Sequence, residues 1–163
     1  MKIAVRSFNG VRSDASDWNQ IAEFAKEAES LGADSIWTSE AWGTDAITPL
    51  AYLAAATTKI RLGTGIVQVG SRTPGNLVMT SLTLQSMSGG RFILGLGTQI
   101  KPHITKRFSM EWSRPAARMR EMILATRAIW DAWETGERLN FRGEFYQHTL
   151  MTPFFNPGKN PYG

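Results

Sequence analysis

The sequence predicts an α/β fold built on parallel strands. Strand-like segments alternate four times with segments whose apolar residues recur at helical spacing, and the strands begin near residues 2, 34, 60 and 91. The fourth strand is a nearly continuous apolar run, typical of a strand covered on both faces. Such alternation requires parallel strands joined by right-handed crossovers. Two architectures satisfy it, a doubly wound open sheet and a (β/α)₈ barrel.

The first two strand–helix units occupy about residues 2–57. We expect a strand over Lys2–Phe8 and a helix over Asp17–Leu31, where the apolar positions have helical spacing. Gly32 stands where a helix often has a C-terminal glycine. A short strand over Ser35–Thr38 precedes a helix over Thr48–Thr57. A Thr-Pro pair opens that helix, as an N-cap residue followed by proline predicts.

The third and fourth units follow the same plan. We expect a β-branched strand over Ile60–Val69 and a helix over Thr73–Met87, again opened by a Thr-Pro pair. The fourth strand covers Arg91–Gly97, and a long loop leads to a helix over Pro115–Trp133 that ends at Gly136. The apolar stripe of that helix is predicted to consist of Met119, Met122, Ile123, Thr126, Trp130 and Trp133.

The alternation stops after the fourth unit. Residues 139–146 alternate and turn as a small hairpin does, and the remaining segment is rich in proline and glycine. We therefore predict a single partial domain over residues 1–163, with a hairpin and loop insertion at residues 137–163.

Composition excludes several classes of protein. Hydrophobic residues make up 42% and charged residues 20%, as in globular domains. No apolar stretch approaches the roughly 20 residues that cross a bilayer, and Met1–Arg6 resembles a strand rather than a signal peptide, so we expect a cytoplasmic protein. Cysteine is absent, and the two histidines are far apart without an HExxH motif, so no metal site is expected.

The net charge of +4 raises the question of an anionic partner. The basic residues are spread along the chain, with one denser group in the second half. That group consists of Lys101, Lys106, Arg107, Arg114, Arg118 and Arg120. It is either a solvated surface or an attraction for an anionic cofactor or substrate. Nucleic acid is not expected, because interleaved aromatic residues and a known binding motif are both missing.

Two glycine-rich runs lie in the third and fourth strands, Gly63–Gly65 and Gly95–Gly97. Neither completes a dinucleotide-binding GxGxxG, because the third glycine position holds Gln68 in one run and Ile100 in the other. No P-loop motif occurs either. Glycine within a strand permits close approach of a flat ligand or an unusual peptide bond, or it allows tight packing in a barrel interior.

Polar candidates follow the carboxyl ends of two strands. Glu40 and Asp45 follow the second strand, where catalytic groups of parallel barrels gather, although Asp45 is also suited to capping the next helix. His103 follows the fourth strand and is either a cofactor ligand, an acid–base group or an exposed loop histidine. His148 lies in the hairpin region and is expected to be structural.

Four segments together resemble the luciferase-like monooxygenase family, and within it the branch that uses the deazaflavin coenzyme F420. They are Leu31–Trp37, Arg61–Val69, Arg72–Pro74 and Ser88–Gly97, and the resemblance extends over nearly the whole chain. It implies a (β/α)₈ barrel with the ring of the cofactor at the carboxyl ends of the strands. This chain would then be the first half of the barrel, and the strands that supply much of the cofactor phosphate site would be absent.

The resemblance also assigns residues. It places a non-prolyl cis peptide at Gly65–Ile66, behind the ring, and Glu40 near the pyrimidine side of the ring. Many F420-using relatives have a histidine after that acid, where this chain has Ala41. The remaining cofactor-binding positions implied by the resemblance are Thr98, Gln99 and His103.

The function implied is hydride transfer between F420 and a small organic substrate, with Glu40 as the catalytic residue, in a homodimer formed through the second and third helices. One alternative is an FMN-dependent monooxygenase of the same fold. Another is a truncated half barrel without catalytic activity, since half a barrel exposes unpaired strand edges.

Overall fold

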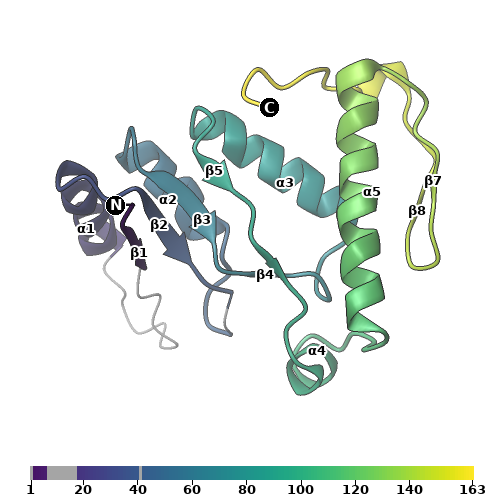
Figure 1. The fold of residues 1–163 in the computed structure, drawn as a ribbon, viewed down its shortest axis with the longest axis horizontal. Helices are drawn as coiled ribbons and strands as arrows, with labels where there is room; N and C mark the ends of the chain where they lie inside the picture. The colour runs from purple at the N-terminus through teal and green to yellow at the C-terminus, as the bar shows by residue number, and fades with distance from the viewer. Residues whose placement is uncertain (1, 7–17, 41) are drawn as a thin grey trace. The chain divides into compact units, whose positions relative to one another are not determined.

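The computed structural model describes residues 2–6, 18–40 and 42–163 of the chain (Figure 1). Contacts between Cα atoms divide the chain into two compact units. The first unit consists of Met1–Val67 and Thr83–Leu96, and the second consists of Gln68–Leu82 and Gly97–Gly163.

The first unit contains a four-stranded parallel sheet. Its strands are β1 (Ala4–Arg6), β2 (Ser35–Thr38), β3 (Arg61–Thr64) and β5 (Phe92–Ile93), in the order β1-β2-β3-β5. Every neighbouring pair is parallel. The register places side by side Val5, Ile36, Leu62 and Phe92. The predicted α/β class with parallel strand–helix units is therefore confirmed.

Two helices of the first unit pack through small or branched apolar side chains. Helix α1 (Trp18–Ser30) buries three alanines, whose small size permits close approach of the helix to its neighbours. Helix α2 (Thr48–Ala56) buries Leu50 and Leu53, which are fully enclosed. The predicted first strand and first helix extend further than the observed ones, and residues 7–17 between them lie outside the described residues.

The predicted third and fourth strands are each interrupted, so the prediction of one continuous strand was wrong in both cases. Residues 60–69 form β3 and then β4 (Val67–Gln68), with a cis peptide bond between Gly65 and Ile66. Residues 91–97 form β5 and then β6 (Leu96–Gly97), with Gly95 between them. Strands β4 and β6 pair with each other in a separate ladder. The first interruption lies at the cis bond and the second at Leu94 and Gly95.

The second unit is organised around helix α5 (Pro115–Thr135), which follows the short helix α4 (Lys101–Lys106). Helix α3 (Pro74–Met87) begins in this unit and ends in the first. The buried face of α5 consists of Met122, Ala125, Thr126, Ile129 and Ala132. The predicted apolar stripe was therefore partly wrong, because the alanines Ala125 and Ala132 are buried where the prediction had larger side chains. Trp130 and Trp133 pack only partly buried against the core cluster that contains Val78, Ile129 and Leu139.

The predicted hairpin is present as β7 (Phe141–Arg142) and β8 (Gln147–His148), which pair antiparallel beside α5 (Figure 1). The carboxylate of Glu121 on α5 accepts hydrogen bonds from the backbone N–H groups of Phe145 and Tyr146, both at 2.7 Å. The chain then runs on to a single 3₁₀ turn, η1 (Pro153–Phe155). Glu121 therefore fixes the hairpin turn to the helix.

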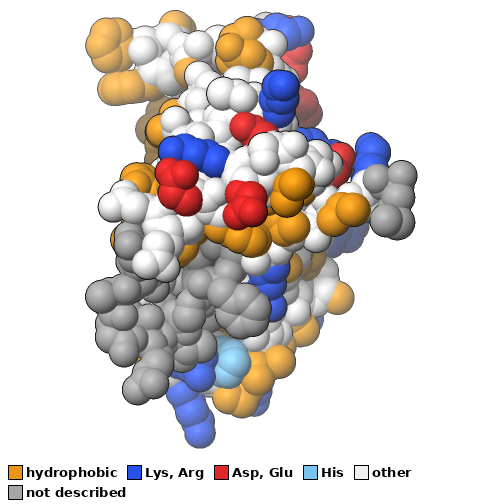
Figure 2. Space-filling view, turned by 90° about the vertical axis from the view of Figure 1, so that its left-hand side faces the viewer, with side chains coloured by type: hydrophobic (Ala, Val, Ile, Leu, Met, Phe, Trp, Pro, Cys, Tyr) orange, Lys and Arg blue, Asp and Glu red, His pale blue; other side chains and the backbone are white. Residues whose placement is uncertain are grey.

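Charged side chains of both signs are interspersed with hydrophobic ones on the face of the molecule shown in Figure 2. Among the described residues, no helix combines the length and the apolar character needed to cross a membrane.

Candidate active site

The carboxyl ends of β2 and β3 meet at one edge of the parallel sheet, where active sites of such sheets are built. Thr38 ends β2 and is fully buried, and its hydroxyl donates a hydrogen bond of 2.5 Å to the carbonyl oxygen of Ala46. Thr64 ends β3 and is equally buried. Thr38 and Thr64 thus fix the backbone at this edge of the sheet, directly before the candidate residue Glu40.

Thr64 and Gly95 form a reciprocal contact. The Thr64 hydroxyl donates to the Gly95 carbonyl oxygen at 2.9 Å and accepts from the Gly95 N–H at 2.8 Å. A Cβ atom added to Gly95 would collide with the backbone carbonyl oxygen of Thr64. The Gly95 oxygen also accepts from the Val67 N–H at 2.8 Å. Close backbone approach therefore requires glycine at 95, and it explains why β5 and β6 are separate strands.

Gly63 has a different purpose. A Cβ atom there would lie within 3 Å of three ring atoms of Trp37. The indole N–H of Trp37 donates to the Ser35 hydroxyl at 2.9 Å, which fixes the ring. Of the two interpretations left open for the strand glycines, tight packing therefore holds at Gly63.

The peptide bond between Gly65 and Ile66 is cis, at the position given by the family resemblance. Its two residues bond to the end of β2 and to the residues that follow it. The Gly65 N–H donates to the Thr38 carbonyl oxygen at 2.7 Å, and the Ile66 carbonyl oxygen accepts from the Glu40 N–H at 3.3 Å. A Cβ at Gly65 would meet its neighbours at ordinary van der Waals distance, 3.7 Å or more.

Glu40 lies directly after β2 and is 8% exposed. A carboxylate this buried is uncommon unless it is paired or has a function. Its backbone bond to Ile66 brings two of the predicted site residues together in the first unit. Ala41, which stands where many relatives carry histidine, lies outside the described residues.

Asp45 has a structural role. One of its carboxylate oxygens accepts hydrogen bonds from the backbone N–H groups of Ile47 and Thr48, both at 2.8 Å. These groups lie at the start of α2 and have no partner within the helix. Asp45 therefore binds the first N–H groups of α2 from two residues before the helix N-cap, a position that Ile47 occupies instead of Asp45 or Thr48.

Thr98, Gln99 and His103 lie in the second unit, after β6. Gln99 has a positive φ of 62°, and its side-chain oxygen accepts from the Ile100 N–H at 3.2 Å. The same oxygen lies 3.1 Å from Nδ1 of His103. Because that oxygen is an acceptor, Nδ1 donates, and Nε2 of the neutral ring is then an acceptor. Gln99 thus orients the imidazole that the sequence singled out.

The sequence did not predict α4, which lies within the expected loop and carries His103. A helix of six residues is too short to show a hydrophobic period, although Pro102 in its first turn is typical of a helix start. The contact between Thr64 and Gly95 was also missed, because it joins residues 31 positions apart. In the sequence, only the position of Thr64 between Gly63 and Gly65 pointed to this contact.

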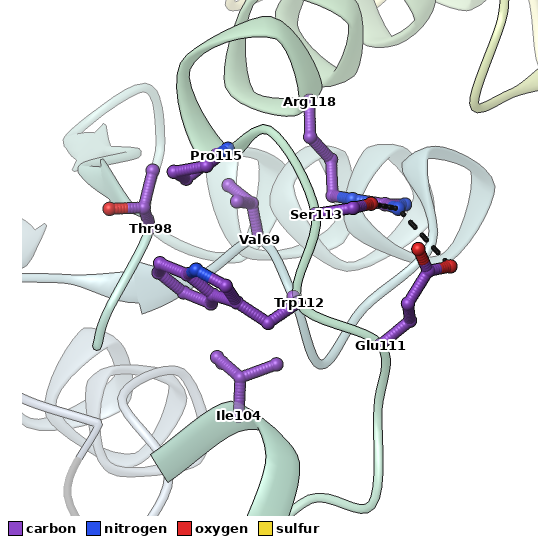
Figure 3. A pocket seen from close by; sticks show the side chains of 9 residues that line it. Val69, Thr98, Ile104, Glu111, Trp112, Ser113, Pro115 and Arg118 are labelled. Carbon is purple, nitrogen blue, oxygen red and sulfur yellow. Dashed lines mark hydrogen bonds and ion pairs between the residues drawn. The ribbon is translucent and has the colours of Figure 1, made fainter. Parts of the chain in front are cut away.

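Thr98 also lines a pocket of the second unit between α4 and the start of α5 (Figure 3). Its empty volume is about 240 Å³, part of which is open to solvent. The room inside it for the centre of a water-sized molecule is about 10 Å³, so the pocket holds about one water. Within residues 2–6, 18–40 and 42–163, no three metal-binding side chains lie close enough to hold an ion.

Comparison with known proteins gives consistent results. The model of the luciferase-like monooxygenase family matches residues 1–161. An uncharacterized protein of Mycobacterium tuberculosis is 48% identical over 155 residues, which are 93% of this chain and 45% of the relative. A second protein of that organism, provisionally named a coenzyme F420-dependent oxidoreductase, is 43% identical over 109 residues, or 67% of this chain and 31% of the relative.

A solved structure shows the same fold. It is the oxygenating constituent of 3,6-diketocamphane monooxygenase from Pseudomonas putida in complex with FMN, with a TM-score of 0.81 at 18% identity over 100% of this chain and 49% of that one. The chain spans less than half the length of the curated relatives it matches. On the family match and these similarities, the chain belongs to the luciferase-like monooxygenase family.

Proposed function

We propose that the protein transfers a hydride between coenzyme F420 and a small organic substrate. Membership of a family of oxidoreductases and monooxygenases supports an enzyme with a flavin or deazaflavin cofactor. The relative named for F420 shares 43% of its aligned residues with this chain, which favours the deazaflavin. The active form would be a cytoplasmic homodimer in which the strand–helix units belong to a (β/α)₈ barrel.

One observation carries the proposal, the buried Glu40 held against the Gly65–Ile66 peptide at the carboxyl edge of the sheet. The pyrimidine part of a flavin or deazaflavin ring has an N–H that needs an acceptor. A buried carboxylate is a strong acceptor, because a hydrogen bond to a charged group contributes more than a neutral one. Glycine at 65 leaves the backbone beside it uncovered by a side chain, as a flat ring requires.

These residues fit the cofactor, and the chain would act mainly by positioning it. When bound, the deazaflavin supplies the hydride chemistry. Glu40 would hold the ring N–H or polarise a substrate group, and the Gly65–Ile66 peptide would support the ring. Thr98 and Gln99 are the further residues proposed to bind the cofactor. His103, with Nδ1 bonded to Gln99, presents Nε2 as an acceptor for a hydrogen bond or a proton.

A second candidate is an FMN-dependent monooxygenase that uses reduced flavin and oxygen. The FMN complex whose fold this chain shares favours it. FMN and F420 present the same pyrimidine edge to Glu40, so the first-unit contacts suit either cofactor.

Parallel titrations with F420 and FMN test the choice. The protein has six tryptophans, and Trp37 packs beside the strand that leads into the cis peptide, so binding should quench tryptophan fluorescence. We expect saturable quenching by F420 at micromolar concentration or below and weaker quenching by FMN. Tight binding of FMN without binding of F420 would contradict the first candidate and support the second.

A further inference from the structure

An exposed arginine, Arg6, stands at the carboxyl end of the parallel sheet, where β1 ends beside β2 (Figure 1). Its Nη2 donates a hydrogen bond of 2.6 Å to the hydroxyl of Ser39, which lies 33 positions further along the chain. Ser39 directly precedes the buried Glu40. The cation of Arg6 is therefore held against the segment that carries the residue proposed to bind the cofactor.

The side chain of Arg6 lies on the more open face of this sheet. Successive residues of a strand point to opposite faces, and the row that contains Ile36 and Leu62 is fully enclosed. Arg6 and Trp37 form the next row, in which Trp37 is half-buried and Arg6 is exposed. Arg6 is thus open to a ligand at the end of the sheet where ligands of parallel sheets bind.

The positive charge of Arg6 has no carboxylate partner within residues 2–6, 18–40 and 42–163, where its guanidinium bonds only to the Ser39 hydroxyl. Arg61, on β3 of the same sheet, gives the contrast. It is also exposed, but its guanidinium pairs with the carboxylate of Asp34. A guanidinium carries several N–H donors, and one hydroxyl uses only one of them. Arg6 therefore keeps both its charge and most of its donors for another acceptor.

The hydroxyl of Ser39 can bind the same ligand as Arg6. A hydroxyl has one hydrogen to donate in addition to the lone pairs that accept. The oxygen of Ser39 accepts from Arg6, and in the described part of the chain its hydrogen has no acceptor. Accepting from a cation polarises the O–H bond and makes it a stronger donor. Arg6 and Ser39 thus present neighbouring donors to an incoming oxygen anion.

We propose that Arg6 and Ser39 form a subsite for an anionic oxygen group, a carboxylate or a phosphate, at the carboxyl end of the sheet. The guanidinium binds the anion through charge-assisted hydrogen bonds, and the Ser39 hydroxyl donates a further one. The inference rests on the proposed function in one respect, because the anion is taken to belong to the substrate or cofactor of that reaction. It adds a ligand class that the contacts of Glu40 do not specify.

A purely structural contact is the competing explanation. The hydrogen bond between Arg6 and Ser39 would then only join the end of β1 to the segment that follows β2. Such a contact predicts lower stability when Arg6 is removed, but it predicts no affinity for free anions. The two explanations therefore differ in anion binding and not in stability.

Inorganic phosphate and acetate are suitable probes, with acetamide as the uncharged control of the same shape as acetate. Binding is followed by heteronuclear NMR at constant ionic strength, through the Nε–H signal of Arg6 and the backbone N–H signal of Ser39. Saturable shifts with both anions are expected, with dissociation constants on the order of 1–10 mM, since a few charge-assisted hydrogen bonds provide about that affinity. Acetamide should bind at least about tenfold more weakly than acetate.

Variants of the two arginines separate the subsite from general surface charge. Arg6→Met should weaken phosphate binding about tenfold or more, because it removes the charge and its donors. Arg6→Lys keeps the charge without the planar guanidinium, so a smaller loss of about three- to fivefold is expected. Arg61→Met is the matched control, since Arg61 is exposed on the same sheet but paired with Asp34. It should change phosphate binding less than about twofold.

Ser39→Ala keeps the test decisive if Arg6→Met does not fold. It leaves the cation and removes one donor, so phosphate affinity should fall about three- to tenfold. Absence of saturable phosphate binding, or equal binding of acetate and acetamide, would overturn the proposal. So would unchanged phosphate affinity in Arg6→Met or in Ser39→Ala, or a loss in Arg61→Met as large as that in Arg6→Met.

The affinity of Arg6→Met for F420 identifies the source of the anion. A fall of about tenfold or more would assign the subsite to the anionic tail of the cofactor, whereas unchanged F420 affinity would assign it to the substrate. The two proposals can fail separately. Phosphate binding that depends on Arg6 without any F420 binding would support the subsite and contradict the proposed function. F420 binding without binding of phosphate or acetate would do the reverse.

Discussion

The two ends of the parallel sheet in the first unit use charged residues in opposite ways. At the amino end, Glu29 accepts from the Thr58 and Ile60 N–H groups at 2.9 and 2.8 Å, just before β3. Arg91, just before β5, donates to the carbonyl oxygens of Ala54 and Ile60 at 3.0 and 2.9 Å. Both charged side chains therefore form hydrogen bonds with backbone groups of the protein.

At the carboxyl end, backbone and hydroxyl groups join β2, β3 and β5, and the guanidinium of Arg6 at the end of β1 donates to the Ser39 hydroxyl at 2.6 Å. Thr38, Thr64, Gly65 and Gly95 tie the strand ends together without using a charged side chain. Glu40 is buried beside them. The amino end therefore uses its charges to stabilise the fold, whereas the role proposed for Glu40 at the carboxyl end concerns the cofactor.

Gly95→Ala should have the largest effect on stability. Its Cβ would collide with the Thr64 carbonyl oxygen, and backbone cannot move aside as a flexible side chain can. We expect a loss of about 3 kcal/mol or more in the free energy of unfolding. Urea unfolding measures it, and Gly75→Ala, where a Cβ meets nothing, is the control. A loss below about 1 kcal/mol would show that the close approach is not required.

Arg91→Met should come next, because it leaves the carbonyl oxygens of Ala54, Thr57 and Ile60 without their donor. A loss of about 2–3 kcal/mol is expected. Arg61→Met is the matched comparison, since the Arg61–Asp34 pair is more exposed and should contribute at most about 1 kcal/mol. Equal losses of unfolding free energy in the two variants would show that the bonds of Arg91 to backbone carbonyl oxygens stabilise the fold no more than the exposed Arg61–Asp34 ion pair does.

Asp45→Ala should cost about 1 kcal/mol, the usual value for a lost helix cap. It removes the acceptor for the Ile47 and Thr48 N–H groups at the start of α2. Thermal unfolding gives the loss, and Asp45→Asn should recover most of it. Because Asp45 is structural, F420 affinity should stay within about twofold. A larger fall in F420 affinity would show that Asp45 contributes to cofactor binding.

Glu29→Gln should have the smallest effect, and that effect should depend on pH. Burial opposes ionisation of Glu29, but the N–H groups of Ile60, Lys59 and Thr58 outweigh it and lower the pKa of the carboxyl below 4.5. A lowered pKa in the folded state stabilises the protein above the unfolded value, and this contribution disappears as the pH falls through the folded value.

The cost of Glu29→Gln at pH 7, about 1 kcal/mol or less at this half-buried position, should therefore shrink as the pH falls toward 3. Urea unfolding of both proteins at pH 7, 5 and 3 measures the difference. A cost that stays constant over this range would contradict an ionic contact.

The sequence predicted the parallel strand–helix units because hydrophobic period and Thr-Pro helix starts are local features. It also led to Glu40 and to the Gly65–Ile66 cis bond, the latter through the family resemblance alone. The break in the fourth strand was missed, because the contact between Thr64 and Gly95 beside it joins distant residues and leaves no local pattern. Arg6 was not singled out, because its contact with Ser39 joins residues 33 positions apart.

The central claim is that Glu40 at the carboxyl end holds a deazaflavin ring whereas Glu29 at the amino end only stabilises the fold. The most direct test is F420 titration of the wild type, Glu40→Gln and Glu29→Gln by tryptophan fluorescence, with thermal unfolding as the folding control. Glu40→Gln should bind F420 about tenfold more weakly with unfolding temperature nearly unchanged, since a neutral acceptor replaces a charged one. Glu29→Gln should bind F420 normally. Equal F420 affinity in all three proteins would contradict the claim.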